Sequence, residues 1–301
     1  MRAIAAWLVD RPRNGVFGLA TTLLLPMSPI LSGMVMAHLV FANGIRVPVV
    51  QALVAGSVLA VIALVMNVSA IQIAVSALTW WVPVFLLAAL AGYWRSMTLA
   101  LQVSAIVALL GTLGFFVVVG DPIAYWNNVI TASVQVLGQA GLQRQADMLL
   151  NNQAQIVPQM TMLFVSIIWT FYVVVTLLGY ALFQLLPDMD GVNGRFCDLN
   201  FGRVIAVLMA VTSVAAVLTG SAWLQNVGFV SFIIFWLQGL AVIHWLQAAA
   251  KLPSFVLIMV YASLPILNAL LVVPLAVLGY TDAWFDFRTR IGMKKKTRLE
   301  K

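Results

Sequence analysis

Long runs of apolar residues, separated by short polar segments, occupy most of this chain. A helix needs about 20 mostly apolar residues to cross a bilayer. Stretches of that kind lie near residues 16–42, 47–66, 70–92, 97–119, 158–186, 204–222, 226–247 and 254–280. The pattern predicts an all-α fold, an integral membrane helical bundle of about eight transmembrane helices. We expect residues 1–301 to form a single polytopic membrane domain.

Two features subdivide the apolar runs. Asn67 and Ser69 are the most polar point between Val47 and Gly92, so we place a tight turn there. Pro26 and Pro29 lie inside the first stretch, where each removes a helix donor and crowds the preceding turn. The first span is therefore expected to break near residues 25–28.

The segment 120–157, between the fourth and fifth spans, has a different pattern. Apolar residues recur there at helical spacing, at Ile123, Trp126, Val129, Ile130, Val134 and Leu137, and they alternate with Asn and Gln. This predicts an amphipathic helix on the membrane surface. The other polar segment, 187–203, is interpreted as a compact loop, and either segment could be a simple connector.

Small residues recur every four positions in two spans. The two sets are Ala52, Gly56 and Ala60, and Thr212, Ala216 and Gly220. Small residues at this spacing let helix backbones approach closely. We expect them to pack helices within one bundle, with dimerisation as the alternative.

The composition agrees with a membrane protein. Hydrophobic residues make up 63% of the chain and charged residues 8%, whereas a soluble domain is typically about 25% charged. Seven of the sixteen basic residues lie between Arg288 and Lys301. A basic tail after a membrane helix favours contact with anionic lipid head groups, so we expect the lipid bilayer as the partner and no nucleic acid.

The basic residues also predict the orientation. With eight crossings, eleven basic residues fall on the side of the two termini and five on the other. Cytoplasmic segments carry the excess of Lys and Arg. We therefore expect a multi-pass protein of the bacterial inner membrane with both termini cytoplasmic.

No catalytic or metal-binding motif is present. None of the nine acidic residues falls inside a predicted span, and the two histidines lie on separate spans. Intramembrane charge usually marks an ion pathway, and hydrolases and phosphotransferases need motifs that this chain lacks. Cys197 is the only cysteine. We expect no catalytic residues, no metal and no cofactor, and hence no enzyme.

A few polar residues remain at membrane depth, and these are the candidate ligand-binding residues. They are His38 in the first span, Gln238 and His244 in the seventh, and Asn268 in the eighth. Each should face the bundle interior, because lipid supplies no hydrogen-bond partners. We expect Gln238 to line a cavity shared by the last spans; hydrogen bonding between helices is the alternative.

The residues after Tyr280 predict a short interfacial helix. Asp282 is placed near its start, where the helix dipole favours an acidic residue. Trp284, Phe287 and Ile291 would form its apolar face.

Three C-terminal segments carry a family resemblance. GRFCDLNFGR at 194–203, LQGLAVIHWL at 237–246 and LGYTDAWFDFRTR at 278–290 resemble the YybS-like family of bacterial multi-pass membrane proteins, a domain of unknown function. The ending of the family motif corresponds here to Gly279, Asp282, Trp284, Asp286, Phe287 and Arg288. The layout also distantly resembles the substrate-binding subunits of energy-coupling-factor vitamin transporters. The resemblance implies a multi-spanning inner-membrane protein and no particular substrate.

Two functions fit these observations. The first is a carrier, or a membrane-embedded binding subunit, for a neutral or apolar small molecule, in which case other membrane subunits are possible partners. The alternative is a non-transporting scaffold or assembly factor that docks through the surface helix and the basic tail.

Overall fold

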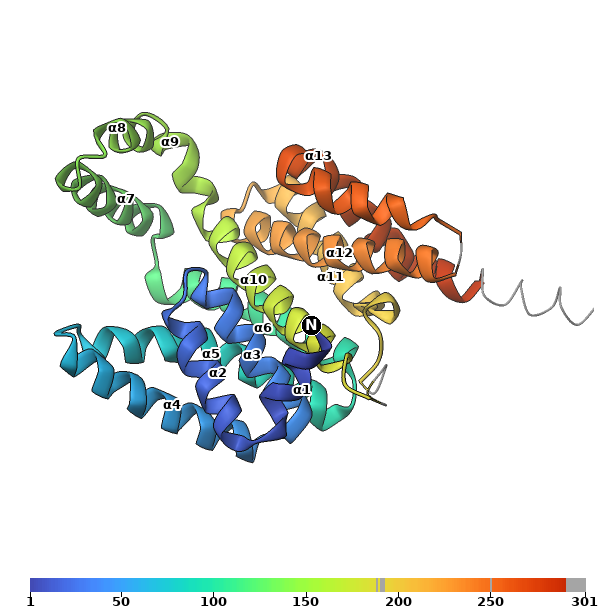
Figure 1. Ribbon diagram of the computed structural model, residues 1–301. Coiled ribbons are helices and arrows are strands. Elements are labelled where there is room, and N and C mark those ends of the chain that lie inside the picture. Colours follow the sequence, from blue (N-terminus) through green and yellow to red (C-terminus); the bar gives the residue numbers. More distant parts are fainter. Residues whose placement is uncertain (188, 190–192, 250, 291–301) are drawn as a thin grey trace, which may run out of the picture. The chain divides into compact units, whose positions relative to one another are not determined.

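A computed structural model describes residues 1–187, 189, 193–249 and 251–290, apart from the side chains of 265–269. Every regular element in this part of the chain is a helix (Figure 1). The chain divides into two compact units. Unit 1 comprises Met1–Ser104 and Thr170–Leu199, and unit 2 comprises Ala105–Trp169 and Asn200–Lys301. Two of the three boundaries fall inside apolar helices, α6 (Met97–Val119) and α10 (Met160–Phe183), and the third falls between Leu199 and Asn200, outside the helices.

The described residues of unit 1 contain five complete α-helices, parts of two more and one short 3-10 helix. The complete helices are α1 (Arg2–Asp10), α2 (Pro12–Leu24), α3 (Ser28–Asn43), α4 (Arg46–Val65) and α5 (Ala70–Trp94). The start of α6 (Met97–Val119), the end of α10 (Met160–Phe183) and the short helix η2 (Phe196–Asp198) complete it.

The first apolar stretch forms two helices instead of one. α2 ends at Leu24, Met27 takes a left-handed conformation, and α3 begins at Ser28, so the predicted break is confirmed. The two helices pack side by side, and the Ser32 hydroxyl donates back to the Leu19 carbonyl at 3.4 Å. The stretch 16–42 is therefore two helices that fold back on each other at the proline break, and its crossing of the membrane as one span stays a prediction.

α3 is the central helix of unit 1. Small residues let its neighbours approach it: Gly33 leaves room for Val175, and Gly179 of α10 lies against Ala37 and the Met34 carbonyl. His38 is fully buried on the same helix. α3 packs against α1, α2, α4 and α5, so its buried residues form the middle of the unit 1 core.

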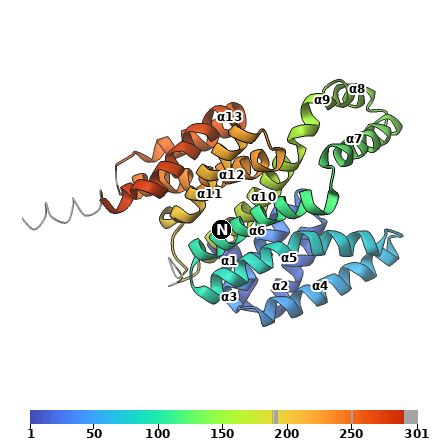
Figure 2. The same cartoon turned by 180° about the vertical axis from the view of Figure 1, so that it is seen from behind.

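α4 and α5 form an antiparallel pair (Figure 2). Their connection is the predicted turn: Asn67 has a positive φ, and the Ser69 hydroxyl caps α5 by accepting from the Gln72 amide. The tip of the α2–α3 hairpin lies beside this turn, because Leu24, Ser28, Val68 and Gln72 line one small cavity.

Unit 2 contains the remaining helices. They are the end of α6, α7 (Pro122–Gln139), α8 (Gln143–Asn151), α9 (Gln153–Ile156), η1 (Val157–Gln159), the start of α10, α11 (Gly202–Thr219), α12 (Ala222–Ala248) and α13 (Ser254–Phe285). α12 is the most buried of the long helices and packs against α11 and α13.

α7 lies where a surface helix was predicted, and the Asp121 carboxylate caps its first turn. Trp126 and Ile130 of its apolar face are buried against Val157, and the Trp126 indole donates to the Thr161 hydroxyl at 2.8 Å. This part of the face therefore contacts protein. A position on the membrane surface stays a prediction for the rest of α7.

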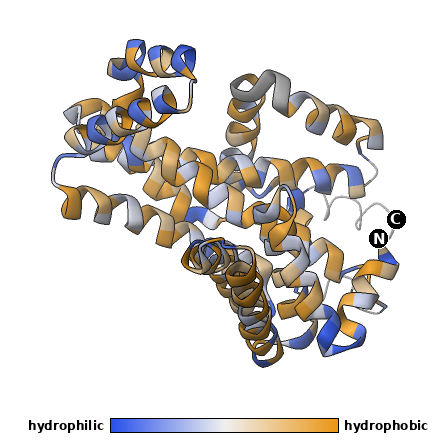
Figure 3. Ribbon diagram, turned by 60° about the vertical axis from the view of Figure 1, so that its left-hand side comes forward, coloured by the Kyte–Doolittle hydropathy of each residue, from blue (hydrophilic) through white to orange (hydrophobic). Residues whose placement is uncertain are grey.

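Among the described residues, six helices are long and apolar enough to cross a membrane: 46–65, 70–94, 97–119, 153–183, 202–219 and 222–248. Hydrophobic positions predominate along the long helices in the view of Figure 3, as expected where lipid replaces water. α3 and the two described parts of α13 are apolar but shorter. These helices indicate a helical membrane protein, whereas the predicted number of eight crossings is not confirmed.

Candidate functional site

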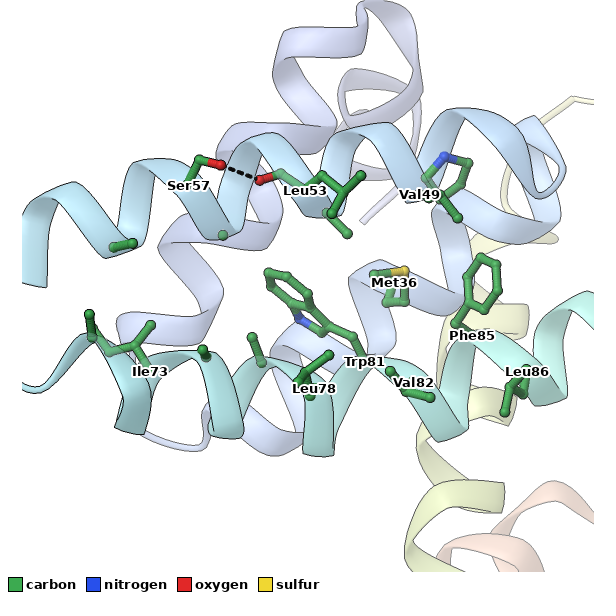
Figure 4. Close-up of a pocket in the computed structure, with 17 residues that line it drawn as sticks. Met36, Val49, Leu53, Ser57, Ile73, Leu78, Trp81, Val82, Phe85 and Leu86 are labelled. Atoms are coloured by element: carbon green, nitrogen blue, oxygen red, sulfur yellow. Dashed lines mark hydrogen bonds between the residues drawn. The ribbon is translucent and has the colours of Figure 1, made fainter.

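An apolar groove runs between α4 and α5 and has a volume of about 620 Å³ (Figure 4). We call it the α4–α5 groove. Its lining consists of Met36, Pro48, Val49, Ala52, Leu53, Gly56, Ser57, Ala60, Ala70, Ile73, Ala74, Ala77, Leu78, Trp81, Val82, Phe85 and Leu86. Ligand sites commonly have volumes of roughly 300–1,000 Å³. The groove is therefore large enough for a small molecule or a hydrocarbon chain.

The small residues of α4 hold this groove open. The positions that pack α4 into the unit are Gln51, Ala55, Leu59 and Ala63, each buried. Ala52, Gly56 and Ala60 lie one position further round the helix and line the groove. A Cβ on Gly56 would meet no atom within 4 Å. The expectation that this set packs a helix tightly is wrong for Gly56, which faces open space.

Trp81 of α5 forms the floor of the groove. Its indole reaches between the two helices in Figure 4 and donates from Nε1 to the Ser32 hydroxyl at 2.7 Å. On the opposite wall, the Ser57 hydroxyl donates to the Leu53 carbonyl at 2.9 Å. Both polar groups are therefore engaged by protein. The groove can bind apolar groups by burial, and its lining includes no charged side chain.

A second, polar cluster lies in unit 2, where α12 meets the end of α13. Gln238 and Asp282 are fully buried, and Arg288 is 8% exposed. The Gln238 carbonyl accepts from the Phe201 amide at 2.8 Å, and its NH₂ donates to the Asp282 carboxylate at 2.9 Å. Arg288 donates to the same carboxylate oxygen at 2.7 Å. Gln238 faces the interior as expected, but protein groups occupy both ends of its amide.

Two glycines bring α12 and α13 into backbone contact beside this cluster. A Cβ on Gly239 would clash with the Leu275 carbonyl oxygen, and one on Gly279 would clash with the Phe235 carbonyl oxygen. Small residues permit such close crossings between membrane helices. The room beside Gln238 is therefore filled by the neighbouring helix.

The motif residues after Gly279 terminate α13. Asp282 lies in its last turn, so the prediction of a helix start there is wrong. The negative end of the helix dipole disfavours a carboxylate at that position, and the Arg288 charge compensates. Asp286 ends the helix in a left-handed conformation. The Trp284 ring contacts Tyr280, and the Phe287 ring stacks on Phe285.

The other candidate residues lie apart from this cluster. His38 belongs to unit 1, where its Nε2 lies 3.0 Å from the Ala5 carbonyl oxygen. His244 Nε2 lies 2.9 Å from the Tyr261 hydroxyl. This contact joins α12 to α13, as in the alternative of hydrogen bonding between helices. The Asn268 side chain lies outside the described residues, as do 291–301 of the basic tail. The described side chains include no group of three His, Cys, Asp or Glu that could hold a metal ion.

Cys197 lies outside the helical spans, in η2. Burial, followed by the nearby Asp198 carboxylate, raises the pKa of its thiol. A raised pKa disfavours the reactive thiolate.

Comparison with known protein families, curated proteins and solved structures found no match to this chain. The assignment of this chain to the class of helical membrane proteins therefore rests on its long apolar helices alone. The resemblance to the YybS-like family stays a hypothesis.

Proposed function

We propose that this protein binds an apolar molecule within the bilayer, as a carrier or as the membrane-embedded binding subunit of one. The observation that carries the proposal is the α4–α5 groove. Protein interiors are normally close-packed, yet Gly56 and its neighbours Ala52 and Ala60 leave a long apolar space beside Trp81. The lining of the groove includes no charged group, which fits a protein that binds its ligand without transforming it.

The scaffold function remains the second candidate, and α7–α9 support it. α8 is strongly amphipathic, yet Ala146 is its only buried residue. Such a helix offers a surface for another membrane subunit or for lipid. In this function the groove would carry no ligand, and the α7–α9 segment would hold a stoichiometric protein partner.

The bacterial inner membrane is the proposed location, with lipid contact at the basic tail and no nucleic-acid partner. The side on which each terminus lies depends on the first apolar stretch. A hairpin over α2 and α3 returns the chain to the side of entry, so seven further crossings would place the termini on opposite sides. Both termini are cytoplasmic only if one of those seven stretches does not cross.

The test identifies the molecules that copurify with wild type and compares them with those that copurify with two matched variants. Gly56→Phe fills the groove from a position with open space around it, whereas Val61→Phe adds the same ring on the outer surface of α4, where Val61 is 61% exposed. Mass spectrometry of the purified protein should find an apolar molecule at a stoichiometric level in wild type and Val61→Phe. Gly56→Phe should lose it. Equal retention by the two variants, or no such molecule in wild type, contradicts the binding function.

A further inference from the structure

The length of the α4–α5 groove favours one chemical class of ligand. Its lining extends from Pro48 to Ala60 on α4 and from Ala70 to Leu86 on α5. At 1.5 Å per helical residue, these runs are about 18 and 24 Å long. The hydrocarbon core of a bilayer is about 30 Å thick. The groove therefore has the length of an extended hydrocarbon chain within the membrane.

A second cavity, of about 590 Å³, begins on the same two helices where the groove ends. Its lining includes Ile45 and Arg46, which precede groove residue Pro48, and Ala88 and Ala89, which follow groove residue Leu86. We call it the arginine cavity. The two cavities thus follow one another along α4 and α5, from apolar to polar.

The described lining of the arginine cavity carries two positive charges, those of Arg46 and Arg95. Arg46 is the first residue of α4 and Arg95 follows the last residue of α5, and both residues line the cavity. Its described lining has no carboxylate, and the structure records no ion pair for either guanidinium among the described residues. Tyr93 and Asn193 add polar groups. Guanidinium groups bind phosphate with charge-assisted hydrogen bonds.

We propose that the occupant is an anionic membrane phospholipid, with an acyl chain in the α4–α5 groove and its phosphate in the arginine cavity. The charge complementarity of the two cavities carries this assignment: an apolar chain matches the groove, and an acidic head group matches Arg46 and Arg95. The inference rests on the proposed function, because the chain must bind in the groove. It goes further by specifying the head group.

The experiment uses the full-length protein, delipidated in detergent, with equal amounts of phosphatidylglycerol and phosphatidylcholine bearing the same acyl chains. Native mass spectrometry counts each bound lipid. A diazirine in the acyl chain then reports by cross-linking which residues the chain contacts. Wild type should prefer phosphatidylglycerol roughly thirtyfold, the size expected when each of two arginines contributes about 1 kcal/mol to the attraction of an anionic lipid. The cross-links should map to Ala52, Gly56 and Ala60.

Two pairs of variants separate the claims. The double variant Arg46→Gln with Arg95→Gln should abolish the preference for phosphatidylglycerol, while the acyl chain still cross-links to the groove. The control is Arg144→Gln, which replaces an exposed arginine of unit 2 and should change neither the preference nor the cross-links. Gly56→Phe should abolish the groove cross-links of both lipids, and Val61→Phe should keep them. Unchanged groove cross-links in Gly56→Phe overturn the proposed function itself. Their loss, together with a preference that survives the arginine variants, overturns only the head-group assignment.

Three other outcomes also count against this assignment. A preference that persists while the arginine double variant unfolds at lower temperature would give both arginines a structural role. A bifunctional protein cross-linker that joins α4 or α5 of two protein copies would place a second copy in the groove. If the double variant does not fold, wild type is tested with a lipid that carries a photoreactive group beside its phosphate. Labelling of residues 44–48 and 93–97 supports the assignment, and labelling elsewhere overturns it.

Discussion

The Asp282 carboxylate and the Arg288 guanidinium form an ion pair across the end of α13, with 2.7 Å between Oδ2 and Nη2. Asp282 is fully buried and Arg288 nearly so. The pair links the last turn of α13 to the residues that follow it. Because Gln238 donates to the same carboxylate oxygen, the pair also ties this turn to α12.

Breaking this pair on one side should destabilise unit 2 strongly. Asp282→Leu leaves a buried guanidinium without its counter-charge, and Arg288→Met leaves a buried carboxylate, at a cost of about 3–5 kcal/mol each. The double variant removes both charges and should be milder than the sum of the two. Thermal unfolding of the purified protein in detergent measures all three. Additive losses would show that the two charges do not interact.

Gln238→Leu should lower stability without affecting ligand retention. The substitution leaves the Phe201 amide without its acceptor and the Asp282 carboxylate without one donor, at a cost of about 1–3 kcal/mol per buried group. Lipid bound per folded molecule, measured by mass spectrometry, should equal wild type. A folded Gln238→Leu protein that retains less ligand would restore the predicted cavity in the last spans.

The features predicted correctly from sequence are local. The run 97–119 is a helix with those bounds, and the Asn67–Ser69 turn lies where the polarity indicated, because apolar length and capping residues act within a few positions. The proline pair likewise fixed the break near Leu25. The direction in which the chain continues after this break depends on the packing of α2 against α3, and no local sequence pattern indicates that packing.

The features that were missed depend on distant contacts. Gln238 is 44 positions from Asp282, so the pattern indicated a buried amide without its partner. Small residues permit close packing of helices, yet they also leave space where no helix covers them. Gly239 has the first outcome and Gly56 the second. Only the position of the neighbouring helix distinguishes them.

This contrast gives a direct prediction for glycine substitutions. Gly239→Ala and Gly279→Ala each place a methyl group against a carbonyl oxygen of the facing helix, so α12 and α13 must separate. Overpacking of this kind typically costs about 1–3 kcal/mol. Gly56→Ala is the matched control, since its Cβ meets open space, and it should not be destabilising. Thermal unfolding compares the three, and equal unfolding temperatures would contradict the close crossing.

The α2–α3 hairpin predicts that residues 13 and 45 face the same side of the membrane. α2 has 13 residues and α3 has 16, or about 20 and 24 Å of helix, each shorter than a hydrocarbon core of about 30 Å. The antiparallel contact between Ser32 and Leu19 returns the chain toward its point of entry. A single continuous span would place the two positions on opposite sides.

Cysteine labelling distinguishes these arrangements. In a Cys197→Ser background, Arg13→Cys and Ile45→Cys should react with a membrane-impermeant maleimide from the same side of oriented vesicles. Val68→Cys, in the exposed turn beyond α4, is the control and should react from the other side. If Arg13→Cys and Val68→Cys react together while Ile45→Cys does not, α2 and α3 cross as one span. A reporter fused to residue 301 would then be expected on the same side as the N-terminus; with the hairpin and seven further crossings, it should lie on the opposite side.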